Sequence, residues 1–296
     1  MELVVIEVVN AKKVYGSITA LEDISFKVEK GTIHGLIGLN GSGKTTLIKA
    51  LVGVHKLDGG YVKILGEEVF ENRDIKRKIG YVADRNRFFK SYTVNRIINF
   101  YANIYPDFDI KKFDEYNSRM KLPKDRKISA LSKGMQMKLS IMLNLSRNPE
   151  VLILDEPTSG LDVITKKDIF KFIISAVEQS GVTVLISSHQ LHELEKLCDD
   201  ITMICQGKMD TQQTMNQIRE NLKKIQVAFN SNDVVIEKDE AILKVTKIGS
   251  IYYILTNNIE ETTKKLTELG ATLIEELNMT VEEIFIDINE NEEENV

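Results

Sequence analysis

The feature that most constrains this chain is a glycine-rich loop at residues 38–46, with the sequence Gly-Leu-Asn-Gly-Ser-Gly-Lys-Thr-Thr. Residues 32–37 before it are β-branched and apolar, as in a buried strand, and the apolar residues after it share one helical face. This strand–loop–helix context is the one that a phosphate-binding loop requires. The alternative, a Gly/Ser-rich turn without a ligand, does not explain eight matching positions with the correct flanks.

Each residue type in this loop suits the binding of a phosphate. Glycines let the backbone curl so that its N–H groups converge, and the helix N-terminus adds positive potential. Lys44 can reach the β- and γ-phosphates, and the Thr45 hydroxyl can ligate the magnesium ion that bridges them. The loop therefore predicts a nucleotide site formed by Gly38, Leu39, Asn40, Gly41, Ser42, Gly43, Lys44, Thr45 and Thr46.

A second signal is the segment 151–156, Val-Leu-Ile-Leu-Asp-Glu, which is typical of a buried parallel strand that ends in two carboxylates. Ligands of open α/β sheets bind at such strand ends. Asp155 suits the magnesium shell, and Glu156 is placed to polarise a water molecule against the γ-phosphate. His189 follows the next buried strand, 183–187, and a phosphate contact is predicted for it too. Simple solvated charge is the alternative, which the companion loop disfavours.

Composition fits a globular chain of about two domains, with 296 residues, 28% charged and 43% apolar. The net charge of −5 gives no global field that would attract nucleic acid, so no nucleic-acid partner is expected. Residues 1–9 lack the basic start of a signal peptide, and no stretch approaches the ~20 apolar residues that span a bilayer. Cys198 and Cys205 have no metal-like spacing and are expected to be reduced thiols.

The middle of the chain is predicted to be a helical insertion in an α/β core. Apolar residues recur at helical spacing from 94 to 105, and the helical pattern continues to about Pro149 with a break at Leu122-Pro123. Ser132 is a good N-cap for the helix that carries residues 137–145. Together with the Gly134 backbone and the helix dipole it also forms an anion site, and the phosphate bound there would have to come from another site.

Two groups of aromatic residues have two interpretations each. Tyr15 is either a core residue or a ring that stacks on a base. Phe88, Phe89 and Tyr92 lie in a polar loop, where they either pack the helical insertion or form an exposed docking patch.

The C-terminal part, from about residue 216, is predicted to be a separate small unit. Strands are expected at 224–229, 241–245, 251–256 and 271–275, with an amphipathic helix at 259–269. An acidic, disordered tail is expected at 289–296. The expected role of this unit is to stabilise the rest of the chain or a dimer.

The ordered motifs of the first three quarters of the chain resemble those of ABC-transporter ATP-binding subunits. Tyr15 corresponds to the aromatic adenine loop, residues 38–46 to Walker A, and residues 131–135 to the signature sequence. Residues 154–157 correspond to Walker B with its catalytic glutamate, residues 159–162 to the D-loop, and His189 to the switch histidine. The resemblance implies an α/β P-loop cassette at 1–215, with a mixed sheet, flanking helices and a helical subdomain at about 92–148. A small α+β accessory domain at 216–296 would follow it, in which residues 280–285 resemble the terminal helical segment that many exporter-type cassettes carry.

The same resemblance implies that two cassettes pair head to tail, as a homodimer or a heterodimer. Each ATP and its Mg²⁺ would lie between Lys44 of one chain and Ser132, Gly134 and Met135 of the other, with Tyr15 stacked on adenine. Glu156 would be the general base, His189 would contact the γ-phosphate, and Asp162 would communicate across the dimer. The cassette would sit on the cytoplasmic face of the membrane, bound to a separate integral-membrane permease.

Two departures from the family pattern stand out. Lys133 and Met135 replace the glycine and glutamine that are usual in the signature, and Asp84 falls where the family has a glutamine. We hypothesise that Asp84 links magnesium to the permease contact, and the Ser-Lys-Gly-Met signature resembles cassettes paired with bacterial exporters of antibiotics or amphipathic peptides. A soluble translation or DNA-repair ATPase of the same superfamily is the alternative. It is disfavoured because the chain has one Walker A motif and no sustained heptads. A regulatory cassette that does not hydrolyse ATP is disfavoured by the intact Glu156 and His189.

Overall fold

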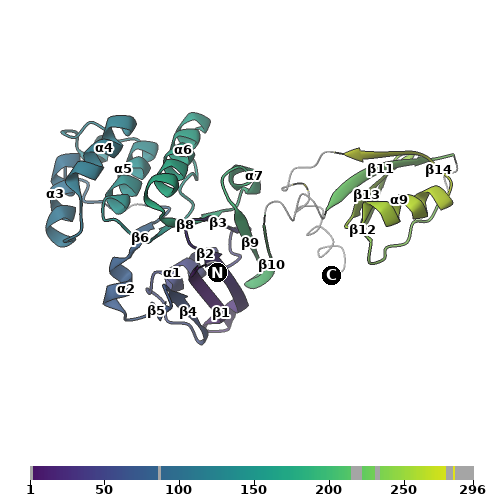
Figure 1. Ribbon diagram of the computed structural model, residues 1–296, viewed down its shortest axis with the longest axis horizontal. Coiled ribbons are helices and arrows are strands. Elements are labelled where there is room, and N and C mark those ends of the chain that lie inside the picture. Colours follow the sequence, from purple (N-terminus) through teal and green to yellow (C-terminus); the bar gives the residue numbers. More distant parts are fainter. Residues whose placement is uncertain (1–2, 86–87, 215–221, 231–233, 278–282, 284–296) are drawn as a thin grey trace. The chain divides into compact units, whose positions relative to one another are not determined.

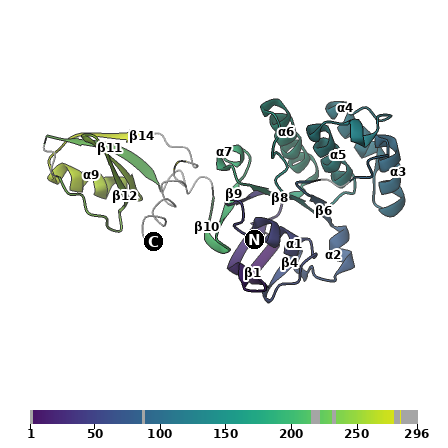
Figure 2. The same cartoon turned by 180° about the vertical axis from the view of Figure 1, so that it is seen from behind.

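The computed structural model describes residues 3–85, 88–214, 222–230, 234–277 and 283. The chain divides into two compact units, Met1–His189 with Leu197–Gln212, and Gln190–Lys196 with Gln213–Val296. Each unit has its own hydrophobic cluster. Figures 1 and 2 show the ribbon from opposite sides.

The first unit is built on a six-stranded sheet whose central strands are parallel. Its strand order is β10-β9-β3-β8-β7-β6. All residues of β3, β7 and β8 are buried, which explains the continuous apolar sequence of β7 and the mostly apolar centres of the other two strands. The strands are Ile33–Ile37 (β3), Ile79–Val82 (β6), Val151–Leu154 (β7), Thr183–Ser188 (β8), Asp200–Cys205 (β9) and Lys208–Thr214 (β10).

An antiparallel sheet packs beside this layer, in the order β2-β1-β4-β5. The β-branched residues at 3–9 and 24–28 predict two short strands. The observed strands are longer, because β1 and β2 continue past shifts in register after Val8 and Ala11. Asn10 has a positive φ at this irregularity, where the apolar alternation is lost. The strands are Val4–Tyr15 (β1), Ile18–Glu29 (β2), Gly59–Ile64 (β4) and Glu67–Glu68 (β5), and the short helix α2 spans Arg73–Arg77.

The helical part of this unit follows β6. Figures 1 and 2 both show α3, α4 and α5 gathered next to α6. Thr93, Asp109, Ser132 and Asp162 cap these helices through their side-chain oxygens, which accept hydrogen bonds from backbone N–H groups of the first turn. The helices are Val94–Ile104 (α3), Ile110–Met120 (α4), the 3₁₀ turn Ile128–Ala130 (η1), Lys133–Leu145 (α5) and Val163–Ser180 (α6). The nucleotide loop is followed by Lys44–Leu51 (α1).

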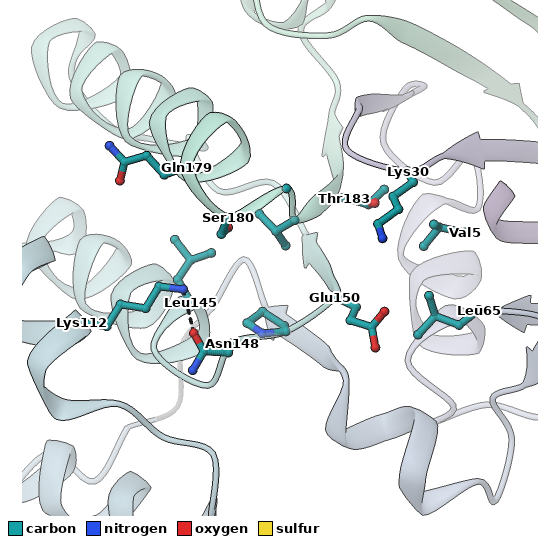
Figure 3. A pocket seen from close by; sticks show the side chains of 13 residues that line it. Val5, Lys30, Leu65, Lys112, Leu145, Asn148, Glu150, Gln179, Ser180 and Thr183 are labelled. Atoms are coloured by element: carbon teal, nitrogen blue, oxygen red, sulfur yellow. Dashed lines mark hydrogen bonds between the residues drawn. The ribbon is translucent and has the colours of Figure 1, made fainter. Parts of the chain in front are cut away.

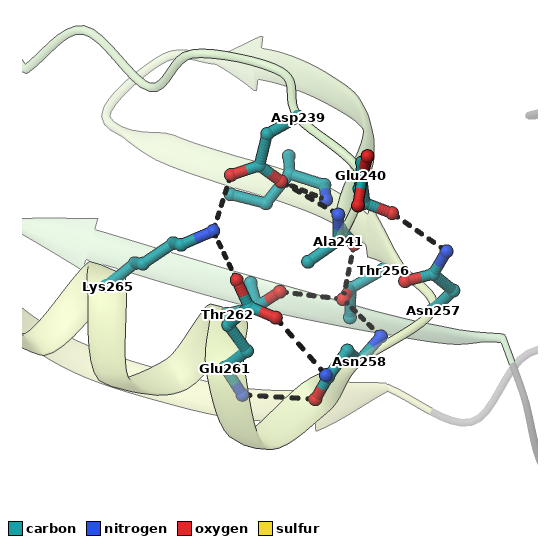
Figure 4. A network of polar contacts seen from close by, with 10 residues as sticks. Asp239, Glu240, Ala241, Thr256, Asn257, Asn258, Glu261, Thr262 and Lys265 are labelled. Carbon is teal, nitrogen blue, oxygen red and sulfur yellow. Dashed lines mark hydrogen bonds and ion pairs between the residues drawn. The ribbon is translucent and has the colours of Figure 1, made fainter.

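The second unit contains a four-stranded antiparallel sheet in the order β12-β13-β11-β14, with α9 in the connection from β13 to β14. Asp239 joins the loop before β12 to α9, since its carboxylate accepts hydrogen bonds from the Ala241 and Ile242 backbone and from Lys265 (Figure 4). The elements are Lys223–Phe229 (β11), Ile242–Ile248 (β12), Ile251–Thr256 (β13), Ile259–Glu268 (α9) and Ala271–Leu277 (β14). The short helix Leu191–Leu194 (α7) also belongs to this unit. Most of the predicted segment 280–285 and the acidic tail lie outside the described residues.

Candidate functional site

The glycine-rich loop lies between β3 and α1, at the carboxyl end of a central parallel strand. Gly43 is the N-cap of α1 with a φ of 109°, a conformation that only glycine adopts readily, and no side chain occupies the cap. A Cβ atom at Gly38 would lie 2.3 Å from the Ile204 carbonyl oxygen, and one at Gly43 would lie 2.6 Å from that of Ala20. The backbone N–H groups at the start of α1 are therefore available to an anion.

Lys44 projects back over the loop from the first turn of α1 and is only 6% exposed. Its ammonium group donates hydrogen bonds to the carbonyl oxygens of Gly38, at 2.6 Å, and Leu39, at 3.2 Å. The same nitrogen lies 3.4 Å from a carboxylate oxygen of Glu156. The loop cation and the predicted general base are thus direct neighbours.

The two carboxylates after β7 have different environments. Asp155 is buried, and this burial raises its pKa, although hydrogen bonds from Ser187 and Thr45 oppose the shift. Glu156 has a φ of 49°, and its backbone N–H donates to Ser187 Oγ at 3.0 Å. Its side chain lies 2.7 Å from Nδ1 of His189. Two adjacent strand ends therefore bring the aspartate, the glutamate and the histidine together.

A cavity of about 570 Å³ contains the loop and both carboxylates. This volume is within the range of small-molecule sites. Sequence reasoning missed part of its wall, namely Ile18–Ala20 of β2 and the turn Gln206-Gly207; only the turn-forming Gln-Gly dipeptide offered a signal. The lining residues are Ile18, Thr19, Ala20, Asn40, Gly41, Gly43, Lys44, Thr45, Thr46, Asp84, Asp155, Glu156, Gln206 and Gly207.

The cavity also has the donor set that magnesium takes beside a nucleotide, since such sites combine one or two carboxylates with phosphate oxygens and water. Thr45, Asp84 and Asp155 all line it, and the Thr45 side chain hydrogen-bonds to Asp155. Oδ1 of Asp84 and Oγ of Ser42 are buried and have no hydrogen-bond partner within the described part of the chain. Among those residues, no three His, Cys, Asp or Glu side chains gather as a protein-only metal cluster.

The signature residues lie outside this cavity. Ser132 caps α5 by accepting a hydrogen bond from the Met135 N–H at 3.2 Å, and its side chain is exposed. Gly134 is buried against α6, where an added Cβ would lie 2.6 Å from Cγ2 of Thr165. Asp162 caps α6, because its two carboxylate oxygens accept from the N–H and the hydroxyl of Thr165. In one chain these residues have structural roles and do not meet the loop's own phosphate site.

Tyr15 is not a core residue. Its ring is 42% exposed at the end of β1, in edge contact with His55 at 5.8 Å between centroids. The ammonium group of Lys13 lies 5.5 Å from the ring centroid. The core interpretation is therefore wrong, and the ring is accessible to a partner.

A second cavity, of about 460 Å³, opens at the other ends of β7 and β8, where Glu150 and Thr183 line it together with Lys30 and Lys112 (Figure 3). Lys112 donates a hydrogen bond to Asn148 there, and burial lowers its pKa. Because ligands of parallel sheets bind at the carboxyl ends of the strands, this cavity is not the nucleotide site.

The geometry of the larger cavity defines a P-loop nucleotide-binding protein with a carboxylate suited to activate water. Comparison with known proteins agrees. The family model described as "ABC transporter" matches residues 21–159. The ABC transporter ATP-binding protein YtrB of Bacillus subtilis is 31% identical, over 90% of this chain and 91% of that protein. The bacitracin transport ATP-binding protein BcrA of Bacillus licheniformis is 35% identical, over 69% of this chain and 68% of that protein.

Solved structures give the same result. A structure described as the ATP-binding subunit of an ABC transporter superposes with a TM-score of 0.66 at 25% identity, covering 73% of this chain and 92% of that one. A nucleotide-free cassette of an ABC transporter gives 0.63 at 26% identity, covering 72% and 92%. The chain therefore belongs to the family of ABC-transporter ATP-binding subunits, which are ATPases, and the predicted fold class and ATP-binding function are confirmed. In the described part of the chain, no helix combines the length and apolar character of a membrane span.

Proposed function

We propose that this subunit hydrolyses Mg–ATP to drive export through a separate integral-membrane permease, on the cytoplasmic face of the membrane. The observation that carries the ATPase part is the contact of Glu156 with both Lys44, at 3.4 Å, and His189, at 2.7 Å. Lys44 and Glu156 line the cavity that contains the phosphate loop, and His189 reaches this site through Glu156. Such a triad places a base, a phosphate-binding cation and an orienting imidazole within one site.

The side chains have separate tasks in this proposal. Lys44 leaves the carbonyl groups of the loop to bind the β- and γ-phosphates, which frees one oxygen of Glu156. That carboxylate then accepts a proton from the attacking water. His189 holds the other oxygen through Nδ1, so Nε2 is the nitrogen that would face the γ-phosphate. Mg²⁺, held by Thr45 and Asp155 with Asp84 beside them, would neutralise charge on the phosphate oxygens.

We further propose that two cassettes complete each site. Ser132, Gly134 and Met135 lie at the N-terminus of α5 but outside the chain's own nucleotide cavity, which supports binding of a second chain's phosphate there. Asp162, in the loop before α6, would transmit contact between the two chains, and Tyr15 would stack on adenine. The unit at 216–296 would support the cassette or the dimer, with no nucleic acid involved.

The permease-facing surface proposed here is the segment from Asp84 to Lys90, of which residues 86–87 lie outside the described part of the chain. Phe89 is 53% exposed, yet its ring also contacts Tyr92 and Phe100 at centroid distances of 4.9 and 5.5 Å. Such an aromatic group is anchored on the helical layer and still presents apolar area to a partner. This arrangement supports both sequence interpretations of the loop at once, packing and docking.

Export of an antibiotic or amphipathic peptide is supported by similarity to the bacitracin transport protein BcrA and to the linearmycin resistance ATP-binding protein LnrL of Bacillus subtilis. LnrL is 35% identical over 68% of this chain and 66% of that protein. A soluble translation or DNA-repair ATPase is not favoured, because YtrB matches along 91% of its own length.

The ATPase proposal is tested by phosphate release from the purified full chain and its Lys44→Ala variant. The variant should lose at least about 100-fold in rate, because removing one transition-state charge donor typically costs that much. Lys49→Ala, a substitution at the other end of α1, is the matched control and should retain the wild-type rate. Equal rates in the wild type and Lys44→Ala would refute the assignment. The proposed link from magnesium through Asp84 to the permease is tested with the Asp84→Ala variant. If its magnesium dependence and its coupling of hydrolysis to transport are both unchanged, the link does not exist.

A further inference from the structure

Lys133 occupies a position where a cation is disfavoured. It is the first residue of α5, directly after the Ser132 cap, and the positive end of the helix dipole lies there. Its side chain is 50% exposed, so solvation offsets part of this cost. A lysine at this position needs anionic or dipolar partners, and the structure provides two.

The first partner is the loop that follows Glu156. The ammonium group of Lys133 donates a hydrogen bond to the carbonyl oxygen of Ser159 at 2.5 Å. The next residue, Gly160, has a φ of 67°, and an added Cβ there would lie 3.3 Å from the same nitrogen. Lys133 therefore connects the start of α5 to the loop between the catalytic carboxylates and α6.

The second partner is Asp84. Its Oδ1 atom lies 3.9 Å from the Lys133 nitrogen, and this oxygen is buried with no hydrogen-bond partner in the described residues. Its Oδ2 atom lies 3.9 Å from the guanidinium of Arg85, which is 93% exposed. Asp84 also lines the nucleotide cavity beside Asp155, so its carboxylate stands between Lys133 and the magnesium end of the site.

Lys133 and Asp84, which both depart from the family pattern, are thus neighbours in the structure. A glycine at position 133 could not reach Asp84, and an amide at position 84 would not carry charge to pair with a lysine. We propose that Lys133 is a positioning residue for the magnesium end of the nucleotide site: its ammonium group draws the Asp84 carboxylate toward the N-terminus of α5 and the Ser159 loop, and it competes with Mg²⁺ for that carboxylate. This inference rests on the proposed function.

This competition between Lys133 and Mg²⁺ predicts the direction in which the Mg²⁺ affinity changes when Lys133 is replaced. Removing the positive charge at position 133 releases an oxygen ligand and removes repulsion between two cations, so Mg²⁺ should bind more tightly. Coupling across an exposed ion pair is about 1 kcal/mol at most, which corresponds to about fivefold in a binding constant. The effect should depend on the charge at Asp84, because that carboxylate is the group that both cations attract.

The test is a Mg²⁺ titration of nucleotide binding, using a fluorescent ATP analogue and the full-length chain, so that the readout does not depend on hydrolysis. Lys133→Gln should lower the half-saturating Mg²⁺ concentration about three- to fivefold. Lys133→Arg keeps the positive charge and should therefore keep the wild-type value. In the Asp84→Asn background the same Lys133→Gln change should shift it by less than about 1.5-fold.

Lys138→Gln is the matched control. Lys138 lies in the same helix and pairs with Asp168 at 2.7 Å, away from the nucleotide cavity, so its loss should leave the Mg²⁺ requirement unchanged. No shift with Lys133→Gln, or shifts of equal size with and without the Asp84→Asn substitution, would overturn the inference while leaving nucleotide binding intact. Failure of the wild-type chain to bind the analogue with Mg²⁺ would instead overturn the proposed function.

Discussion

The packing of α5 against α6 makes a specific prediction about Gly134. Alanine at this position would place its Cβ 2.6 Å from Cγ2 of Thr165, closer than carbon atoms approach without a shift. Thr165 cannot simply rotate away, because its hydroxyl donates a hydrogen bond to Asp162 at 2.7 Å and its N–H donates to the same carboxyl group. The clash must therefore move a helix or break the cap of α6.

The magnitude follows from two opposing effects. Alanine is favoured over glycine in a helix interior by up to about 1 kcal/mol. Overpacking a tight contact costs about 1–3 kcal/mol. We expect a net loss of about 0.5–2 kcal/mol for Gly134→Ala, which lowers the unfolding temperature of the larger unit by roughly 1–8 °C.

Differential scanning calorimetry of the full chain measures this loss, and Thr165→Ser provides the internal control. Serine lacks Cγ2 but keeps the hydroxyl bonded to Asp162. Alone it should cost up to about 0.8 kcal/mol for the loss of one partly buried methyl group. In the Gly134→Ala background it should instead recover most of the loss. If Gly134→Ala is as stable as the wild type, or if Thr165→Ser costs the same in both backgrounds, the proposed clash does not exist.

Three further predictions concern the nucleotide site. Gly43→Ala should abolish nucleotide binding and destabilise the chain by about 1–3 kcal/mol, because φ is 109° and the new Cβ meets a carbonyl oxygen at 2.6 Å; isothermal titration and calorimetry measure both effects, and binding at wild-type affinity would contradict the loop geometry. Asp155→Asn should raise the unfolding temperature at pH 7. The raised pKa of Asp155 means that the folded chain binds this proton more tightly than the unfolded chain does. The wild-type chain therefore loses free energy of unfolding as the pH rises through that pKa, and the asparagine variant does not. The gain should vanish below the ordinary pKa of 3.8, and a gain that persists there would have another cause. His189→Ala should slow hydrolysis about 100-fold or more while nucleotide binding is retained, since the imidazole orients Glu156; an unchanged rate would refute that role.

The parts of the fold that are predictable from the sequence have local causes. β7 is a continuous apolar run and β8 has an apolar centre, so their burial in a parallel sheet follows from composition. α5 begins at its cap Ser132, because a serine oxygen and the first-turn N–H groups are neighbours in sequence. The strand–loop–helix around Lys44 is local in the same way. The sequence underestimates antiparallel pairing in β1 and β2, because bulges interrupt the two-residue period on which prediction depends.

Contacts between distant segments cannot be predicted in this way. From the sequence, Lys133 is expected only to add positive charge near an anion site. In the structure it donates a hydrogen bond to the Ser159 carbonyl oxygen and lies near Asp84, and both residues are distant from it in the sequence. Gly134 fits the family signature, yet its packing against α6 is visible only in three dimensions. The contribution of Gln206-Gly207 to the nucleotide cavity likewise depends on how β9 and β10 place that turn beside the loop.

The most direct test of Glu156 as the base of a paired ATPase is the solution mass of the wild type and of Glu156→Gln, with and without Mg–ATP, together with their hydrolysis rates. Glutamine keeps the size of Glu156 but cannot accept the proton of water. We predict that the variant loses hydrolysis and that Mg–ATP shifts its mass from 33.6 kDa to twice that value, as two chains close on nucleotide that neither can hydrolyse. A variant that hydrolyses ATP as fast as the wild type would contradict the assignment of Glu156 as the base. A variant that loses hydrolysis but stays monomeric would contradict the pairing of two identical chains.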